Sequence, residues 1–352
     1  MAYTDIDDPS AYFQTKLYAG DNASNLVLTF DGNSDLQPDF LWQKQRGGAT
    51  DHNLSNSVIG ADQGLSSNTN EEEQDNGTGY IKSFQSDGFT IGNSDKVNAS
   101  SSTNVAWAWK AGTAVSGNSG GSGTAKAYSG SVNTDAGFSI IKYIGNGTSA
   151  HTIPHHLGAV PQWVIIKELS NASDWMGYHV GKGNTHTLKL NEPEAGVDRT
   201  DWWNDTTPTS SVVTLGDNGE INQNDTNYIM YAFSEKQGYS KFAKYSGNGN
   251  ADGTFIYLGF KPAFFIFKEL AAEAWIIKDN KTETFNPNLT HNRSDSNDAE
   301  NADGWSGMDF LSNGIKLRTS DGSMNESGAA YIYMAFAENP FVSSTGVAGT
   351  AK

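Results

Sequence analysis

Apolar residues in this chain gather in runs of strand length, and three of these runs share one pattern. Each run begins at a proline and ends at a lysine, at residues 38–44, 161–167 and 262–268. Apolar residues at successive positions predict a strand that is covered on both faces, whereas alternation would predict one exposed face. Proline can begin such a strand but cannot continue its hydrogen-bond ladder. The pattern therefore predicts three central strands.

Two further elements accompany each run in the same order. An aromatic strand that ends in a turn precedes the run, and a strand with alanine between two large side chains follows it. The opening strands lie at residues 12–20, 138–147 and 242–249, and the closing strands at 107–109, 231–233 and 334–336. The prolines lie 123 and 101 positions apart (161 − 38 and 262 − 161). A spacing of about a hundred residues is typical of a small domain and predicts three tandem copies of one domain.

The predicted fold class is all-β, with three tandem antiparallel β-sandwich repeats that are jelly-roll-like and about 100 residues long. Glycine, serine and threonine dominate residues 112–124, a composition typical of a flexible linker. No such segment separates the last two repeats, so we expect them to pack as a rigid pair within an elongated body. The predicted divisions are 1–111 (lead-in and repeat 1), 112–135 (linker), 136–238 (repeat 2), 239–340 (repeat 3) and 341–352 (polar tail).

Composition and charge narrow the class of protein. Acidic residues outnumber basic ones by 40 to 23, which gives a formal net charge of −17. Such a surface repels phosphate, so we expect no binding to nucleic acid or to anionic membranes. The chain has no cysteine, which excludes disulfides and thiol catalysis. Residues 1–8 lack the apolar core of a secretory signal, and no run approaches the ~20 apolar residues of a membrane helix.

The segment after each central strand differs most among the three copies, and variable loops on one scaffold are common binding sites. Tryptophan rings in these loops can stack on sugar rings, with amide and carboxylate neighbours to bond the hydroxyls. Closure of a domain edge is the alternative role for the same residues. The candidate glycan contacts are Asp174, Trp175, Asp201, Trp202, Trp203, Asn204, Asp303 and Trp305.

Metal binding and catalysis find less support in the sequence. His151, His155 and His156 lie close together, but the other copies have no matching histidines. Oxygen-rich turns at 217–225 and 295–303 could supply Ca²⁺ ligands, although neither fits the twelve-residue calcium loop and Asx-turns explain both. No carboxylate pair recurs in the copies, and no phosphate-loop or nucleophile motif occurs. We therefore expect no cofactor, no metal site and no enzymatic activity.

Several segments share a further likeness. They are residues 3–18, 37–42, 86–92 and 105–110 near the start, 143–148 and 153–158 in the middle, and 340–344 at the end. These segments resemble the tail-fibre-like and other virion structural proteins of marine bacteriophages, and the likeness covers nearly the whole chain. Where that family usually has Pro-His-Gly-Leu-Gly, this chain has His156 in place of the first glycine. No catalytic role is attached to that motif.

The resemblance implies a non-enzymatic bacteriophage structural protein, located in the virion and released when the host lyses. The first expectation is a tail fibre or receptor-binding component that contacts host surface glycans. Homotrimerisation, as in fibres, and contacts with other virion proteins are expected with it. The alternative is a capsid decoration or head-fibre protein, because three tandem domains could occupy a local threefold site. A polysaccharide depolymerase is a remote alternative that requires two carboxylates ~5–10 Å apart in a cleft.

Overall fold

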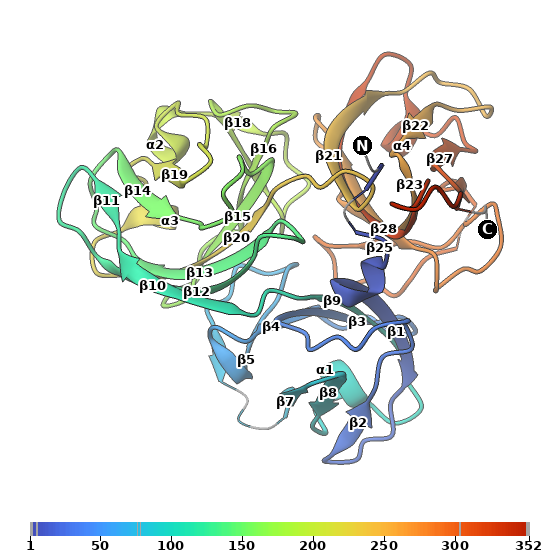
Figure 1. Cartoon of the computed structure of the whole chain (residues 1–352), viewed down its shortest axis with the longest axis horizontal. Helices are drawn as coiled ribbons and strands as arrows, with labels where there is room; N and C mark the ends of the chain where they lie inside the picture. The colour runs from blue at the N-terminus through green and yellow to red at the C-terminus, as the bar shows by residue number, and fades with distance from the viewer. Residues whose placement is uncertain (1–2, 5, 76, 78, 303, 350–352) are drawn as a thin grey trace.

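The computed structural model describes residues 3–4, 6–75, 77, 79–302 and 304–349. The chain folds mostly into antiparallel β-sheets, which confirms the predicted all-β class. Three lobes surround a common centre and form a triangle (Figure 1). We call them unit 1 (residues 13–109, blue to teal), unit 2 (113–233, green to yellow) and unit 3 (240–340, orange to red).

Each unit contains one large sheet. Across the sheet of unit 1 the strands run in the order β1 (Phe13–Ala19), β9 (Thr103–Trp109), β3 (Phe40–Gln45), β4 (Asn53–Asn56), β5 (Gly60–Leu65) and β6 (Gln74–Asp75). In unit 2 the order is β10 (Thr113–Asn118), β12 (Ala127–Asn133), β13 (Phe138–Ile144), β20 (Asn227–Phe233), β15 (Trp163–Glu168), β16 (Met176–His179), β17 (His186–Lys189) and β18 (Val197–Asp198). In unit 3 it is β21 (Ser240–Ser246), β28 (Ala330–Pro340), β23 (Phe260–Glu269), β24 (Ile276–Asp279) and β25 (Asn292–Arg293).

A three-stranded sheet accompanies each large sheet. Its strands are β2 (Leu26–Leu28), β8 (Gly88–Ile91) and β7 (Ile81–Gln85) in unit 1, β11 (Gly120–Gly121), β14 (His151–Pro154) and β19 (Val212–Leu215) in unit 2, and β22 (Phe255–Tyr257), β27 (Gly314–Leu317) and β26 (Met308–Leu311) in unit 3. The helical turns are η1 (Pro9–Ala11), α1 (Asp95–Asn98), α2 (Thr200–Trp203), α3 (Gly219–Asn222) and α4 (Gly322–Asn325).

Five strands of the large sheets follow one order in all three units. The closing strand lies between the opening strand and the proline-led strand, and the next two strands of the chain follow on the far side. The registers agree as well, because Phe40 pairs with Trp109, Trp163 with Phe233, and Phe264 with Phe336. These pairings define which positions correspond among the three units.

Each large sheet is covered on both faces. In unit 1, Leu41 of β3 and Ala106 of β9 pack with Phe89 of the small sheet in one buried cluster. Phe40 and Trp42 point to the opposite face and join a core that is shared with the other two units. The continuous apolar runs are thereby explained, although the second cover comes from neighbouring units and not from the same unit.

Aromatic rings from all three units meet at the centre of the triangle. The ring centroid of Phe336 lies 5.6 Å from that of Trp109 and 5.9 Å from that of Phe233. These residues occupy corresponding positions in the three closing strands, and all are buried. Burial of such a side chain contributes about 1.5–3 kcal/mol relative to exposure. The shared core therefore joins the three units into one body.

The connections between units differ from expectation in two ways. The segment 112–124, expected to be a flexible linker, forms β10 and β11, which pair with β12 and β14 and extend both sheets of unit 2. The units form a closed triangle and not an elongated body, because the apolar outer faces of their sheets pack on one another (Figure 1). Units 2 and 3 do pack together, as predicted, but unit 1 packs on both of them.

An asparagine at the end of a helical turn stabilises each unit in the same way. In unit 2 the buried Asn222 donates from Nδ2 to the carbonyl oxygens of Gly216 (2.6 Å) and Thr148 (3.0 Å). Its Oδ1 accepts from the backbone amide of Asn146 (3.0 Å). We call this arrangement the asparagine latch, and it joins a helical turn to two loops of its unit. The same three bonds are made in units 1 and 3 by Asn98 and Asn325.

Candidate functional site

The residue before the fourth strand of the shared order bonds each unit to its neighbour. Trp175 of unit 2 donates from Nε1 to the carbonyl oxygen of Ser66 in unit 1 (2.8 Å). Trp275 of unit 3 donates in the same way to Lys189 in unit 2 (2.7 Å). Both indoles are almost fully buried. The two bonds follow one rotational sense around the triangle.

His52 takes the corresponding position in unit 1 and closes this ring of bonds. Its Nε2 lies 2.8 Å from the carbonyl oxygen of Arg293 in unit 3, and its Nδ1 accepts from Trp42 Nε1 (2.8 Å). A neutral imidazole satisfies both contacts, with Nε2 as the donor. Burial lowers the pKa of His52 to about 3, which favours that neutral form.

The last residue of the fourth strand makes a second ring of bonds in the opposite sense. Asn56 of unit 1 donates from Nδ2 to the hydroxyl of Tyr231 in unit 2 (2.8 Å). His179 Nε2 of unit 2 lies 3.1 Å from a backbone carbonyl oxygen of β28 in unit 3. Asp279 of unit 3 accepts from Trp107 Nε1 of unit 1 (3.0 Å). Each pair of neighbouring units is therefore joined twice by corresponding positions.

The lysine that ends each proline-led strand is buried beside a loop of the neighbouring unit. Lys268 Nζ donates to the carbonyl oxygen of Pro193 in unit 2 (2.8 Å), and Lys167 Nζ lies 3.5 Å from a backbone carbonyl oxygen of unit 1. Lys44 is influenced by the charges of the loop 298–300 in unit 3. Burial lowers the pKa of all three lysines to about 8. In units 2 and 3 the lysine thus bonds to a variable loop of the neighbouring unit, whereas Lys44 Nζ donates to carbonyl oxygens of Gln45 and Gly48 in its own unit.

The junction between units 3 and 1 has no direct chain connection and carries additional polar contacts. Arg46 of unit 1 and Glu300 of unit 3 form a two-pronged ion pair, with Nη2–Oε2 at 2.7 Å and Nε–Oε1 at 3.0 Å. Lys281 Nζ of unit 3 lies 3.7 Å from Asp31 Oδ1 of unit 1. Bidentate charge-assisted bonds are stronger and more directional than neutral ones, so they suit a junction without a connecting segment.

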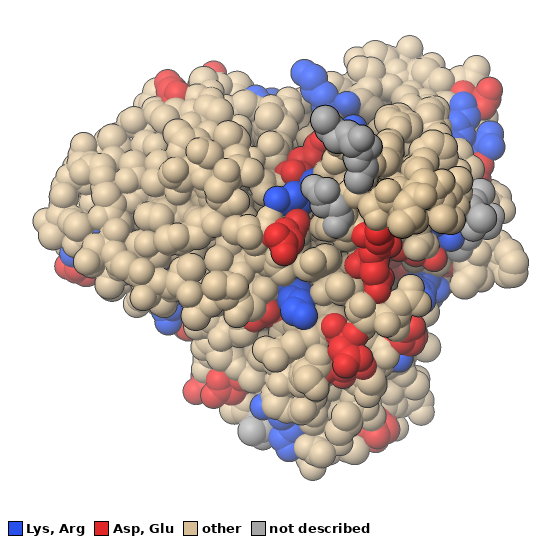
Figure 2. Space-filling view, in the orientation of Figure 1, with Lys and Arg blue, Asp and Glu red and all other residues tan. Residues whose placement is uncertain are grey.

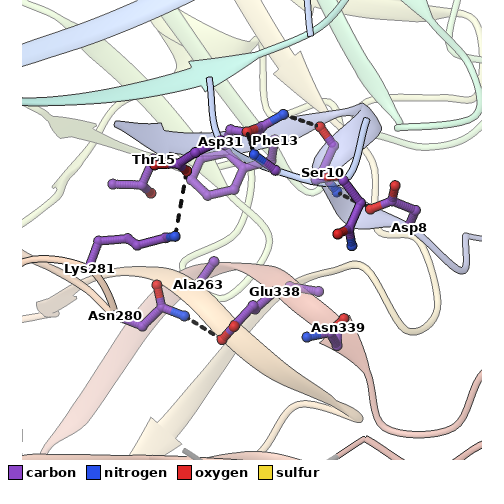
Figure 3. Close-up of a pocket in the computed structure, with 14 residues that line it drawn as sticks. Asp8, Ser10, Phe13, Thr15, Asp31, Ala263, Asn280, Lys281, Glu338 and Asn339 are labelled. Carbon is purple, nitrogen blue, oxygen red and sulfur yellow. Dashed lines mark hydrogen bonds and ion pairs between the residues drawn. The ribbon is translucent and has the colours of Figure 1, made fainter. Parts of the chain in front are cut away.

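A cleft with a volume of about 200 Å³ opens at this 3–1 junction and is the candidate functional site. Residues 8–15 and 31–33 form one wall, and the ends of β24 and β28 in unit 3 form the other. Figure 3 shows Lys281 extending toward Asp31 across the cleft, while Asn280 donates to Glu338 Oε2 (2.5 Å) along the unit 3 wall. The cleft therefore brings together charged and amide groups from segments far apart in the chain.

The tryptophans predicted to stack on sugars are mostly buried, and this corrects the expectation. Trp175 is fully buried in the shared core, where its ring stacks on Tyr231. Trp202 and Trp203 lie in the core of unit 2, where they are 4% and 1% exposed. The short helix α2 turns both rings inward, and the guanidinium of Arg199 covers the ring of Trp202. None of these three rings presents a face to a ligand.

The polar residues predicted beside these rings make contacts within unit 2. Asp174 pairs with Lys189 (2.7 Å), and Asn204 accepts from the hydroxyl of Ser149 (2.7 Å). Asp201 accepts from Arg199 Nε and Asn218 Nδ2. The structure does not gather the predicted residues at one site, since Trp175 belongs to the shared core and Trp202 to the core of unit 2.

Two of the predicted glycan contacts, Asp303 and Trp305, belong to unit 3. Trp305 is half-buried, and its ring lies edge-on to His291 with a centroid distance of 4.6 Å. Asp303 lies outside the described residues. Trp305 is thus the predicted ring that keeps part of its surface exposed.

The histidines and the oxygen-rich turns serve structural contacts. His151, His155 and His156 each make hydrogen bonds within unit 2. The segment 217–225 contains the latch residue Asn222 and the cap of α3. Within the described ranges, no group of three or more His, Cys, Asp or Glu side chains could hold a metal ion. No helix among the same residues is long and apolar enough to cross a membrane.

The excess of acidic residues is unevenly distributed over the face drawn in Figure 2. Charged side chains gather there where the three lobes meet and over units 1 and 3. Most of the unit 2 lobe on this face carries uncharged side chains (Figure 2). On this face the unit 2 lobe is thus the least charged part of the molecule.

The fold and its junctions define an all-β protein in which three sets of strands with one shared order close around a common aromatic core. The chain belongs to the family described as a domain of unknown function, DUF7483, whose model matches residues 8–340. No curated protein and no solved structure matches the chain. The matched residues span all three units of this chain.

Sequence reasoning missed the latch and the cleft for different reasons. The latch left a signal, since Asn98, Asn222 and Asn325 each stand nine positions before the residue that begins the closing motif (107 − 98, 231 − 222 and 334 − 325). The cleft left none, because its walls come from the two ends of the chain and meet only when the triangle closes.

Proposed function

We propose that this chain is a non-enzymatic structural protein of a bacteriophage virion, in which three copies of one jelly-roll-like β-sandwich take the place of a homotrimer. The resemblance of residues 3–18 and of the later segments to virion proteins supports the bacteriophage assignment. The closed double ring of bonds around one aromatic core is the observation that carries the structural role. Such an interlocked body suits a mechanical part of a particle.

This proposal implies that the chain lies on a threefold axis of the virion. One such location is the axis of a tail fibre, where the chain would contact host glycans. The other location is a local threefold site of the capsid, where the chain would act as a decoration protein. The burial of Trp175, Trp202 and Trp203 favours the capsid location, because three of the four rings predicted to contact glycans are inaccessible and only Trp305 keeps part of its surface exposed.

Cryo-electron microscopy of the intact particle tests the location. We expect density for a single chain, centred on a threefold axis with its three lobes around that axis. Absence of the chain from purified particles, checked by mass spectrometry, would overturn the virion role. Sedimentation of the purified chain tests the replacement of a homotrimer. We expect one copy of 37.8 kDa, and a stable trimer of chains would contradict that part of the proposal.

A further inference from the structure

We infer that the cleft at the 3–1 junction binds a small, uncharged saccharide. This inference concerns the purified chain and does not depend on where the chain lies in a particle. The cleft volume of about 200 Å³ is below the ~300 Å³ at which drug-sized pockets begin. It therefore suits one sugar ring and not a long oligosaccharide.

The charged groups of the cleft already have partners within the protein. Asp8 accepts from the side chains of Ser10 (2.6 Å) and Ser34 (2.7 Å). Glu338 Oε2 contacts Lys261 Nζ (3.0 Å) and Asn280. Because these carboxylates are engaged, a free ammonium ligand would gain little by pairing with them.

Asp31 completes the set of carboxylates around the cleft. It lies between Lys16 Nζ (3.5 Å) and Lys281 Nζ (3.7 Å). The lining still holds three carboxylates and one ammonium, so phosphate and carboxylate ligands are repelled. The charge balance of the cleft therefore favours a neutral ligand.

Neutral amides are the groups that remain available in the cleft. Asn33 of unit 1 and Asn339 of unit 3 both line it, and their side-chain amides make no hydrogen bond within the described part of the chain. An amide donates and accepts, which matches the hydroxyl groups of a sugar. The two amides come from opposite walls, so one ligand placed between them can bond to both.

Buried apolar side chains close the floor of the cleft. Phe13, Ala263 and Ala337 line it beneath the polar walls. Figure 3 shows the ring of Phe13 between the Asp31 and Ser10 segments of unit 1. The side chains of Phe13, Ala263 and Ala337 are 2%, 8% and 1% exposed and belong to the shared core, so they close the base of the cleft, and the polar groups of the walls are the ones that can contact a ligand.

The other two junctions carry different residues at the corresponding positions. Counted two positions on from the paired residues Asn56, His179 and Asp279, Lys281 corresponds to Val58 in unit 1 and to Gly181 in unit 2. Asn339 corresponds to Gly112 and Lys236. Of the two proposed binding amides, Asn339 is therefore particular to the 3–1 junction.

Saturation-transfer NMR on the full chain tests the inference, with glucose, galactose, mannose and N-acetylglucosamine as probes. We expect saturation transfer to at least one of these sugars. In the double variant Asn33→Ala/Asn339→Ala the affinity for that sugar should fall about tenfold or more, because two hydrogen bonds are lost. Asn224→Ala changes an exposed asparagine of unit 2 outside the cleft and should bind like the parent. Both replaced cleft residues are exposed, so the fold should persist, which the melting temperature checks.

Three outcomes would overturn the inference. One is the absence of transfer from all four sugars at millimolar concentration. Another is transfer that the double variant leaves unchanged. The third is binding of spermidine, used as a cationic probe, with no binding of sugar, because the ligand class would then be wrong.

Discussion

The asparagine latches are the same in all three units, whereas the residues at the junctions differ from one unit to the next. All three latches use asparagine, and each makes the same three bonds to the backbone. The position before the fourth strand instead holds histidine once and tryptophan twice. A latch needs a donor and an acceptor on one short side chain, which restricts the choice of residue. A junction needs only a ring N–H that reaches a carbonyl oxygen, so different rings can serve.

The largest expected effect comes from the junction tryptophans. Trp175→Ala should lower the free energy of unfolding by about 3–5 kcal/mol, because a buried indole and its bond to Ser66 are lost together. Trp275→Ala should cost a similar amount. His52→Ala, at the corresponding position, removes a smaller ring and should cost less. Urea unfolding followed by circular dichroism measures all three, and a loss below ~1 kcal/mol for Trp175→Ala would contradict the assigned role.

Replacing the latch asparagine should lower the free energy of unfolding by the same amount in each unit, unlike replacement of the junction residues. Asn98→Ala, Asn222→Ala and Asn325→Ala should each cost about 3 kcal/mol, since each loses three hydrogen bonds worth about 1 kcal/mol. The same urea experiment compares them. Losses that differ by more than about 1.5 kcal/mol would show that the three latches are not equivalent.

Acid should weaken the second ring of bonds through His179. Burial lowers the pKa of His179 to about 4, below its ordinary value of 6.5, so the unfolded chain takes up this proton first. The contribution of His179 to stability is therefore lost as the pH falls from about 6.5 toward 4. From pH 7 to pH 5 the parent should lose about 2 kcal/mol more than His179→Gln, whose side chain can donate without titrating.

The comparison with His179→Gln isolates one histidine from the other titrating groups. Burial raises the pKa of Asp295 to about 6, which acts in the opposite direction but is present in both proteins. Unfolding at pH 7, 6 and 5 gives the two curves. Parallel curves would show that His179 does not carry the acid dependence.

The smallest expected losses of stability come from ion pairs, and they should be larger at the 3–1 junction than on the outer surface. Arg46→Ala should cost about 1–2 kcal/mol, because Glu300, only 11% exposed, loses its bidentate partner. Lys126→Ala breaks an ion pair with Asp225, which is 70% exposed and screened by solvent, and should cost clearly less than Arg46→Ala. Equal losses for the two variants would contradict a special role for the Arg46–Glu300 pair.

The strands could be predicted from the sequence because their signals are local. Pro38 and Pro161 precede β3 and β15 as predicted, whereas Pro262 lies inside β23 at an irregularity of its pairing with β28. The closing motifs lie in β9, β20 and β28. The triangle could not be predicted, since the side chains that face neighbouring units are of the same apolar types as those that face their own small sheet. Trp202 and Trp203 lie between strands in the sequence, and nothing local reveals that α2 directs them inward.

The cleft and its two amides belong to one junction of the three, and this has a consequence for how such a protein can evolve. In an assembly of identical subunits one codon sets every interface, so a change that is useful at one interface is imposed on all. In this chain each junction is encoded separately, and mutations can alter one while the others keep the triangle closed. Duplication within one gene thus frees a single corner to acquire a ligand of its own.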